Sequence, residues 1–458
     1  MIERLGSFFA EKVSRILPDS FVFAMVLTFI TILLAITLAG AAPAEIIEAW
    51  VKGVFDPDII FFAFLMIMVL SFGFSIGVSR AFILFFNWLV HFIKKPWQVY
   101  FFLTILSILL MLINWGLAPV LAILAVEICK RVKGVDYRVA IASFYSGLLV
   151  WHGGMSSSAA LMMATEETAQ RFIDMGYISE IIPVSDTLLI NTNLVLIASV
   201  LVLLPILVLF LRPEVVDERW DAAVQYEKKH GKPADAVIGN TSPSSAMEAK
   251  TPAERLNNSP VVSVFLFLLC MTGFAGIIQA RGFNLAALAF LMLGFGVLLH
   301  WRPINFVNTI KASITGSADI VIQFPLFGGI MGIFMATGLA TIFAEGLLTF
   351  ATANTLPWFS YLISSIVNFF IPSGGAEWLV LGPPVLEAAH IVGADPGKTI
   401  IGFAYGDALT NLVNPFWTLT FLPIMGQLMN IRPRDFMGYT AFVCLIFFVI
   451  HSAIILFV

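Results

Sequence analysis

Four interruptions in otherwise apolar stretches carry the residues of this chain that could bind a ligand. They read INWGLAP (113–119), WHGGMSSS (151–158), IPSGGAEW (371–378) and NLVNPFW (411–417). Gly and Pro break a helix, and unwound backbone in an apolar surrounding is tolerated only where it faces protein or a watery cavity. We therefore expect these four segments to form a binding site.

The first and third segments are suited to an anion. A new helix is expected directly after each break, so its N-terminal N–H groups and positive dipole end would face the cavity. Asn114 and Ser373 precede the glycines of the two breaks and can cap that helix or touch a ligand. Capping for these two residues, and packing for Trp115 and Trp378, are the alternatives. The predicted substrate-binding residues are Asn114, Trp115, Gly116, Ser373, Gly374, Gly375, Ser156, Ser157 and Asn414.

The second and fourth segments are suited to a cation or a proton. Unwound backbone and hydroxyl groups can coordinate a cation, and interhelical packing is the alternative for the serines. An ionisable group inside a span is costly, which favours Asp407 as a functional residue. His152 titrates near neutral pH and could carry a proton, with a structural imidazole as the alternative. The predicted coupling residues are Asp407, Asn411, His152, Ser158 and Glu377.

Glu377 is a weaker candidate than Asp407, because its place beside the third break could put it near the outer surface. None of the four segments contains Lys or Arg. An anionic substrate would then be held by dipoles and neutral donors, with its charge offset by a bound Na⁺ or H⁺, which predicts symport. Beyond that ion we expect no cofactor, and we assign no firm metal site other than a candidate Na⁺ site near the broken helices.

Catalysis is not expected. GGMSSS beside a histidine superficially resembles an intramembrane serine protease, but His152 and Ser156 are four residues apart on a broken segment. The sequence contains no HExxH motif of a zinc protease, and the YGD at 405–407 has no second suitable aspartate motif.

Composition defines the class of protein. Of the 458 residues 59% are hydrophobic and 12% are charged, whereas a soluble domain has about 25% charged residues. The net charge of −4, without a basic run, argues against nucleic acid as a partner. Cys129, Cys270 and Cys444 lack CxxC spacing and are expected to pack in the core. The first apolar run, residues 20–42, exceeds a signal-peptide core and is predicted to be a retained span.

A gapless shift of 259 residues relates the two halves of the chain and indicates an internal duplication. It aligns Gly116 with Gly375 and Asn114 with Ser373. The same shift aligns Gly73 with Gly332, Gly134 with Gly393, Asp136 with Asp395, Phe144 with Phe403, and Gly147 with Gly406. Such weak internal symmetry is common in transporter folds.

Lysine and arginine in short loops favour the cytoplasm and orient the repeats. Residues 96–129 have basic residues on both flanks and are predicted to be a re-entrant hairpin that enters from inside, whereas the matching hairpin 357–390 enters from outside. Residues 80–95 fit an interfacial helix better than another span. The clean predicted spans are 20–42, 57–79, 184–211, 259–279, 284–300, 318–340 and 437–458.

The predicted fold is an all-α polytopic membrane protein with two inverted repeats. Each repeat has one re-entrant hairpin and one broken helix, with about nine spans in all. Residues 1–212 form the first repeat and 259–458 the second. Residues 213–258 hold 14 of the 54 charged residues and are predicted to be a flexible cytoplasmic linker. The N-terminus is expected in the cytoplasm.

Several motifs in the same order resemble the bacterial short-chain fatty acid transporter family, over nearly the whole chain. They are LPDSFVFAMVLT near the N-terminus, INWG, IPVSDTL, QFPLFGGI, IPSGGAEW, AYGD and NPFW. The resemblance implies uptake of acetoacetate or butyrate across the bacterial inner membrane, a homodimer, and elevator-like movement of a transport domain. The family pattern at the second tip is PSGGGHW, whereas this chain has Ala376 and Glu377; it also has WHGGMSSS, with His152, in place of WGGGFSGS.

We therefore predict a Na⁺- or H⁺-coupled symporter of short monocarboxylates that lie between the two hairpin tips. A dicarboxylate or other organic-anion transporter or exchanger of the same superfamily is the alternative. The apolar residues beside the breaks (Trp115, Trp378, Phe416 and Trp417) suit a short alkyl tail better than a second anionic group.

Overall fold

The computed structural model describes residues 12, 18–90, 92–174, 176–231, 233–234, 251–281, 285–314, 318–426 and 428–458. Regular structure in these ranges is helical, apart from an isolated antiparallel bridge between Asp136 and Asp221. Helices with the length and apolar composition to cross a membrane cover Pro43–Gly77, Pro96–Ile113, Asn191–Leu211, Pro260–Ala280 and Pro433–Phe457. The prediction of an all-helical multi-pass membrane protein is confirmed at this level.

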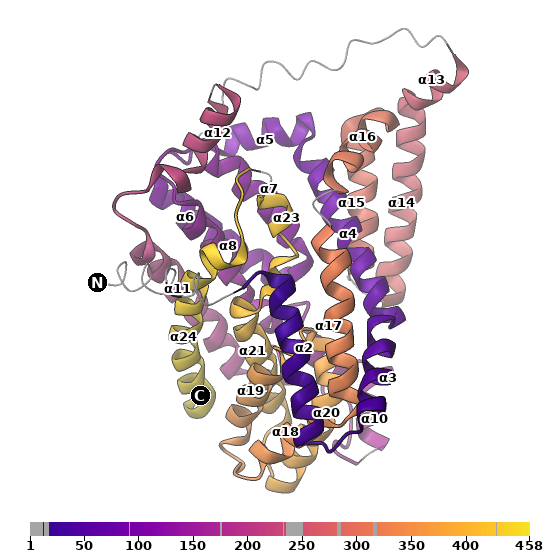
Figure 1. Ribbon diagram of the computed structural model, residues 1–458, viewed down its shortest axis with the longest axis vertical. Helices are drawn as coiled ribbons and strands as arrows, with labels where there is room; N and C mark the ends of the chain where they lie inside the picture. The colour runs from indigo at the N-terminus through magenta and orange to yellow at the C-terminus, as the bar shows by residue number, and fades with distance from the viewer. Residues whose placement is uncertain are drawn as a thin grey trace.

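One group of helices packs around α17 (Ala318–Ala336). This helix contacts α2 (Ser20–Thr37), α3 (Pro43–Val54) and α4 (Pro57–Gly77), and α4 in turn packs on α15 (Leu285–His300) and α16 (Pro303–Ser313). The long helix α14 (Pro260–Arg281) lies against α15, and Figure 1 places α4 and α14 to α17 together on the right. Helices from both halves of the sequence therefore build this group.

The second group contains all four helix breaks. Figure 1 places α6, α8, α11 and α24 of this group on the left. Its elements are α6 (Pro96–Ile113), η1 (Trp115–Leu117), α7 (Ala118–Cys129), α8 (Tyr137–Tyr145), η2 (Ser146–Gly153), α9 (Ser158–Met163), α11 (Asn191–Leu211), α19 (Leu356–Val367), α20 (Gly374–Val392), α21 (Pro396–Thr410), η7 (Asn411–Val413), α22 (Pro415–Thr418), α23 (Leu422–Met425) and α24 (Pro433–Phe457). This group too draws helices from both halves, since α6 packs on η2 and α8, and α21 packs on α19 and η2.

Glycines let α3 and α17 cross with their backbones in contact. A Cβ added to Gly53 would meet the carbonyl oxygen of Gly328, and one added to Gly332 would meet the carbonyl oxygen of Ala49. Small residues at helix contacts allow this close approach in membranes. The helix α3 was not predicted from the sequence as a separate element.

The helix boundaries correct two predicted spans. The first helix ends at Thr37, and the chain turns at Gly40, which has a φ of 63°, before α3 begins at Pro43. The span predicted to begin at residue 184 begins at Asn191, because the Asn193 amide donates to the carbonyl oxygens of Leu188 (2.7 Å) and Gly153 (3.0 Å) and holds the preceding turn outside the helix. Within 80–95 the structure has α5 (Arg80–Val90), whose 11 residues are too short to cross a bilayer.

Positions related by the 259-residue shift share local conformation. Gly134 and Gly393 both have left-handed backbone, with φ of 79° and 70°. Asp136 caps α8 by accepting a hydrogen bond from Arg138 N (2.9 Å), and Asp395 caps α21 by accepting one from Lys398 N (2.9 Å). The first arm of the first predicted hairpin, α6, has 18 residues, whereas the matching α19 has 12, so the two segments differ in depth.

The start of the linker is ordered, which corrects the prediction of a flexible tether over its whole length. Asp221 caps α12 (Ala222–His230), and its other carboxylate oxygen accepts a hydrogen bond from Gly134 N at 2.7 Å. Trp220 lies under the Arg138 guanidinium at 4.6 Å, and Lys133 pairs with Glu227 at 2.7 Å. The Glu227 hydrogen bond raises the pKa of Lys133. Two of the charges that suggested a solvated segment, Asp221 and Glu227, therefore bind the loop before α8. Residues 235–250 lie outside the described ranges.

Replacing Gly53 by Ala tests the contact between α3 and α17. We expect the added methyl to push the two helices apart and to lower the free energy of unfolding by about 1–3 kcal/mol, visible as a lower thermal midpoint in detergent. Gly276→Ala is the matched control, because a Cβ there meets nothing within 4 Å and alanine favours a helix. Equal midpoints for the two variants would contradict the contact.

Replacing Asp221 by Ala tests the docked linker. The change removes a helix cap and leaves Gly134 N unpaired, which together cost about 2–4 kcal/mol. We expect trypsin to cleave at Lys228 or Lys229 at least several-fold faster than in the wild type. Glu218→Ala is the control, since Glu218 makes an exposed ion pair with Lys228 that contributes little. Unchanged cleavage in Asp221→Ala would show that the linker is not held there.

Candidate substrate and ion site

The first tip is held by its own cap. α6 ends at Ile113, and the side-chain oxygen of Asn114 accepts a hydrogen bond from Gly116 N at 2.8 Å. The backbone N–H of Trp115 donates to the hydroxyl of Ser156 at 3.4 Å, which joins the first break to the second. The side-chain oxygen of Asn114 thus acts as a helix cap, which the sequence analysis gave as the alternative to ligand binding.

The helix that follows the second tip has no side-chain cap at its start. α20 begins at Gly374, and the extended residue Ser373 stands at its N-cap, where its hydroxyl accepts no hydrogen bond from the helix. The N–H groups at a helix start have no partner within the helix and attract an anion. Gly374 is required by a close approach, because a Cβ there would meet Nε2 of His152.

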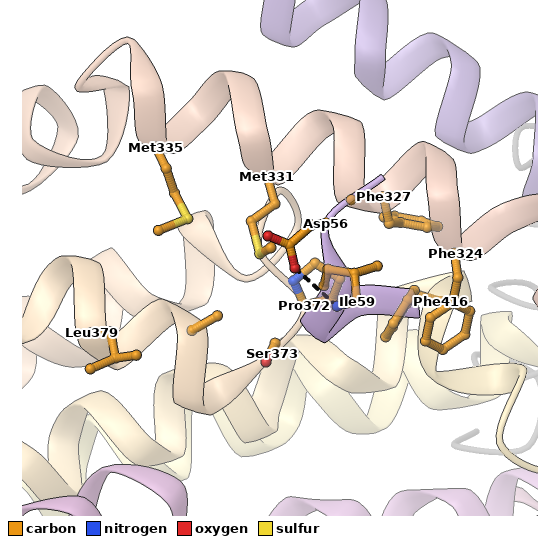
Figure 2. Close-up of a pocket in the computed structure, with 12 residues that line it drawn as sticks. Asp56, Ile59, Phe324, Phe327, Met331, Met335, Pro372, Ser373, Leu379 and Phe416 are labelled. Carbon is orange, nitrogen blue, oxygen red and sulfur yellow. Dashed lines mark hydrogen bonds between the residues drawn. The ribbon is translucent and has the colours of Figure 1, made fainter. Parts of the chain in front are cut away.

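A cavity of about 350 Å³ lies where this tip faces α17. Figure 2 shows Met331 and Met335 of α17 on one side and Ser373 and Leu379 of the tip on the other. Phe416 lies 4.7 Å from Phe324 and 4.8 Å from Phe327, measured between ring centroids. The lining residues are Asp56, Ile59, Phe324, Phe327, Gly328, Met331, Met335, Pro372, Ser373, Ala376, Leu379 and Phe416. Its polar side chains are Ser373 and Asp56, and Asp56 also accepts a hydrogen bond from Ile59 N at 3.0 Å.

The first tip does not line this cavity. Asn114, Trp115 and Gly116 lie instead beside the two broken helices: the Trp115 ring is 6.3 Å from Trp151 and 5.3 Å from Trp417, and Trp151 is 5.9 Å from Trp417. The structure therefore brings the first, second and fourth breaks together through three tryptophans. Of the two tips between which a ligand is predicted to lie, only the second lines this cavity, through Ser373.

Three ionisable side chains meet beside the second tip. His152 Nε2 is 3.0 Å from Asp407 Oδ2, and both residues are fully buried. Glu377 is fully buried next to Asp407 and the hydroxyl of Ser364. Because Glu377 is fully buried, its side chain does not lie on the surface of the protein, and it is as deeply enclosed as Asp407. Ser157 supports His152, with its hydroxyl 3.4 Å from Nδ1.

Amides tie down the second broken helix. Asn368 donates to Asn411 Oδ1 (2.6 Å), to the carbonyl oxygen of Asp407 (3.0 Å) and to the Thr410 hydroxyl (3.0 Å). Asn414 donates to the carbonyl oxygen of Asn368 at 3.0 Å, and its own oxygen accepts from Phe416 N at 3.1 Å. The Tyr145 hydroxyl donates to the carbonyl oxygen of Asn411. Asn411 and Asn414 thus have structural contacts inside the break.

Several buried polar atoms around this point have no hydrogen-bond partner within the described protein. They are Ser364 Oγ, Asn368 Oδ1, both carboxylate oxygens of Glu377, Asp407 Oδ1, the Tyr405 hydroxyl and Trp417 Nε1. Each such atom costs about 1–3 kcal/mol, and native proteins have few of them. Their concentration here marks a site formed for a function other than stability.

Of the predicted residues, Gly374, Gly375, Ser158, His152, Ser157, Asp407 and Glu377 lie in one cluster: a Cβ on Gly375 would be 3.9 Å from Ser158. The sequence analysis missed Asn368, Asn193, Ser364 and Tyr405. The sequence does hold a signal for Asn368 and Ser364, because both are polar residues in an apolar helix that ends at a break. Their partners could not be predicted, because they depend on how α19 packs on α21.

The fold and site define a multi-pass helical membrane protein with a polar site buried between broken helices, which is the architecture of a membrane transporter. The chain belongs to the short-chain fatty acid transporter family, whose model matches residues 1–458. It is 30% identical over 452 residues to a protein of Escherichia coli (strain K12) and 29% identical over 444 residues to one of Haemophilus influenzae (strain ATCC 51907 / DSM 11121 / KW20 / Rd).

Both relatives are assigned by name as short-chain fatty acid transporters, and each match covers 96% of both chains. Their assignment agrees with the expectation that the chain is a transporter and not an enzyme. The solved structure of the Alcanivorax borkumensis YdaH transporter matches 95% of this chain and 98% of its own, with 14% identity and a TM-score of 0.40. At that level the likeness does not bear on mechanism.

Replacing Asn368 by Ala tests whether this side chain holds the second broken helix. Loss of its three donated hydrogen bonds leaves buried acceptors unpaired, so we expect the free energy of unfolding to fall by at least about 2 kcal/mol, measured as a lower thermal midpoint. Asn258→Ala is the control, because the half-buried Asn258 donates one side-chain hydrogen bond, at an exposed position, to the Glu254 carbonyl oxygen at 2.8 Å. Equal midpoints would contradict the role of Asn368.

Proposed function

We propose that this protein takes up short-chain fatty acids or related monocarboxylates, such as butyrate and acetoacetate, by cation symport. The observation that carries the proposal is the cavity between α17 and the second tip, in a chain of the short-chain fatty acid transporter family. Its volume of about 350 Å³ is at the small end of ligand pockets, which suits a small acid.

The substrate carboxylate lies at the start of α20. The Ser373 hydroxyl and the first N–H groups of the helix donate to it, and the helix dipole favours its charge. The alkyl chain lies against Phe324, Phe327 and Phe416, whose burial of apolar surface contributes about 25 cal/mol per Å². Binding therefore needs no Lys or Arg, in line with the composition of the four breaks.

A dicarboxylate fits this cavity less well. Its described lining residues include no Lys, Arg or His. A second anionic group on the substrate would therefore lie against largely apolar side chains with no cationic partner among them, which is costly. Transport or exchange of other organic anions is the second candidate.

Movement of the second group of helices past the first would carry the cavity across the membrane. The cavity lies between the two groups, and each group combines helices of residues 1–212 with helices of 259–458, as two interlocked inverted repeats would. Residues 213–258 connect these repeats on the cytoplasmic side. The proposal includes an elevator-type homodimer in the bacterial inner membrane with a cytoplasmic N-terminus.

Uptake into proteoliposomes tests this function. We expect saturable initial uptake of labelled acetoacetate and butyrate beyond that of protein-free liposomes, and little uptake of succinate or citrate. Ser373→Ala should raise KM by about tenfold or more through loss of one hydrogen bond to a charged group, with Ser199→Ala of α11 as the control. Brisk succinate or citrate uptake without saturable monocarboxylate uptake would sink the proposal.

A further inference from the structure

The cluster of Glu377, Asp407 and His152 combines three titratable side chains from three different elements. Glu377 lies in the first turn of α20, Asp407 in α21, and His152 in η2. All three are fully buried. Two carboxylates and one imidazole are unusual so far from water, because a buried charge is tolerated only when it is paired or functional.

The contacts of the cluster leave the carboxylates only partly satisfied. Asp407 Oδ2 is 3.0 Å from His152 Nε2 and 3.4 Å from the Asn411 amide, whereas no described residue makes a hydrogen bond of normal geometry with Asp407 Oδ1 or with either Glu377 oxygen. The Ser364 hydroxyl lies beside Glu377, and among the described residues it too has no partner of normal hydrogen-bond geometry. The cluster therefore differs from an ion pair whose polar atoms are all hydrogen-bonded, because α19, α20 and α21 each contribute an atom without such a bond.

Within the described residues, no fixed positive charge faces the two carboxylates. The elements α6, α9, α11, α19, η2 and η7 contain no Lys or Arg, and Lys398 of α21 is nine residues before Asp407, about 13 Å along the helix. The Arg138 guanidinium of α8 is paired with Asp136 at 2.7 Å. The other titratable side chains on the elements packed around the cluster are Tyr100 of α6, Tyr137 and Tyr145 of α8, Tyr361 of α19, Tyr405 of α21, Tyr439, Cys444 and His451 of α24, the exposed Glu345 of α18 (Leu339–Leu348), Glu387 and His390 near the far end of α20, and Arg434 and Asp435 at the start of α24.

Two neighbouring carboxylates out of water repel each other, and a single proton between them removes the repulsion. Glu377 also stands one turn after Ser373, since its N–H donates to the Ser373 carbonyl oxygen at 2.8 Å. A substrate carboxylate at the start of α20 would add a third negative charge beside these two. Substrate and proton should therefore favour each other's binding, by the same factor in both directions.

We propose that Glu377 and Asp407, positioned by His152, form the proton-binding site of this transporter, so that one H⁺ binds with each monocarboxylate. The inference rests on the proposed function and deepens it by naming the coupling ion. The proton binds a carboxyl oxygen on the side where the acid is taken up and leaves with the acid on the other side, without any covalent step. A Na⁺ ion fits less well, because an imidazole nitrogen stands 3.0 Å from one Asp407 oxygen, whereas hard cations favour oxygen ligands.

Calorimetry of the purified full-length protein tests the inference. Unlike an uptake assay, it is not disturbed by protonated acids that cross the lipid bilayer by themselves. Titration with acetoacetate in buffers of different ionisation enthalpy, at a pH where the substrate-free site is deprotonated, counts the protons taken up on binding. We expect close to one proton per acid for the wild type, and a Kd that rises about tenfold per pH unit on the alkaline side. Glu377→Gln should take up none and bind with a Kd independent of pH. Glu387→Gln, at an exposed position of the same helix, should behave as the wild type.

The outcomes separate the inference from the function on which it rests. Failure of acetoacetate and butyrate to bind would refute the proposed function. Binding by the wild type without proton uptake, or only with Na⁺, would refute the proton site and leave the function standing. Infrared difference spectra recorded without substrate on lowering the pH give an independent reading: a protonated carboxyl band should appear in the wild type at a higher pH than in Glu377→Gln and Asp407→Asn. Appearance of the band at the same pH in all three would also overturn the proton site.

Discussion

Interrupted backbone inside an apolar body is the constraint on which this structure depends. Each break exposes N–H and C=O groups that neither water nor lipid can satisfy. The protein satisfies many of them from another break or its flanking helices: Met155 N donates to the carbonyl oxygen of Leu112, and the Tyr145 hydroxyl donates to that of Asn411. Because the breaks stabilise one another, they must lie together, and this gathers the polar side chains of four distant segments at one point.

That arrangement leaves polar atoms without partners where a functional site would use them. The amides of Asn368 and Asn414 hold the second broken helix, while the carboxyl groups of Glu377 and Asp407 stay incompletely paired beside it. The neighbouring cavity is largely apolar and is closed by α17 of the other helix group. The carboxyl groups of the cluster and the apolar wall of the cavity thus lie within one helix turn of α20 from each other. A small acid with a charged end and an alkyl end requires such a neighbourhood.

The sequence was sufficient for the features that local chemistry dictates. Gly and Pro within apolar runs located the breaks, and the 259-residue shift anticipated the paired left-handed glycines Gly134 and Gly393. It also singled out Asp407 and His152, which proved to be neighbours. Features that depend on packing between distant helices were not predictable in this way. The inward position of Glu377, the contribution of α17 to the cavity and the docking of Asp221 on Gly134 depend on which helix faces which, and periodicity alone does not fix that.

A crystal structure with (methylseleno)acetate, in which selenium replaces one methylene of butyrate, tests the central claim most directly. The account predicts one anomalous selenium peak in the cavity bounded by Phe324, Phe327 and Phe416, with the carboxylate within hydrogen-bond distance of Ser373 and the start of α20. Competition by butyrate should remove the peak. A selenium peak elsewhere, for example among the tryptophans beside the first tip, with this cavity left without ligand density, would contradict the account.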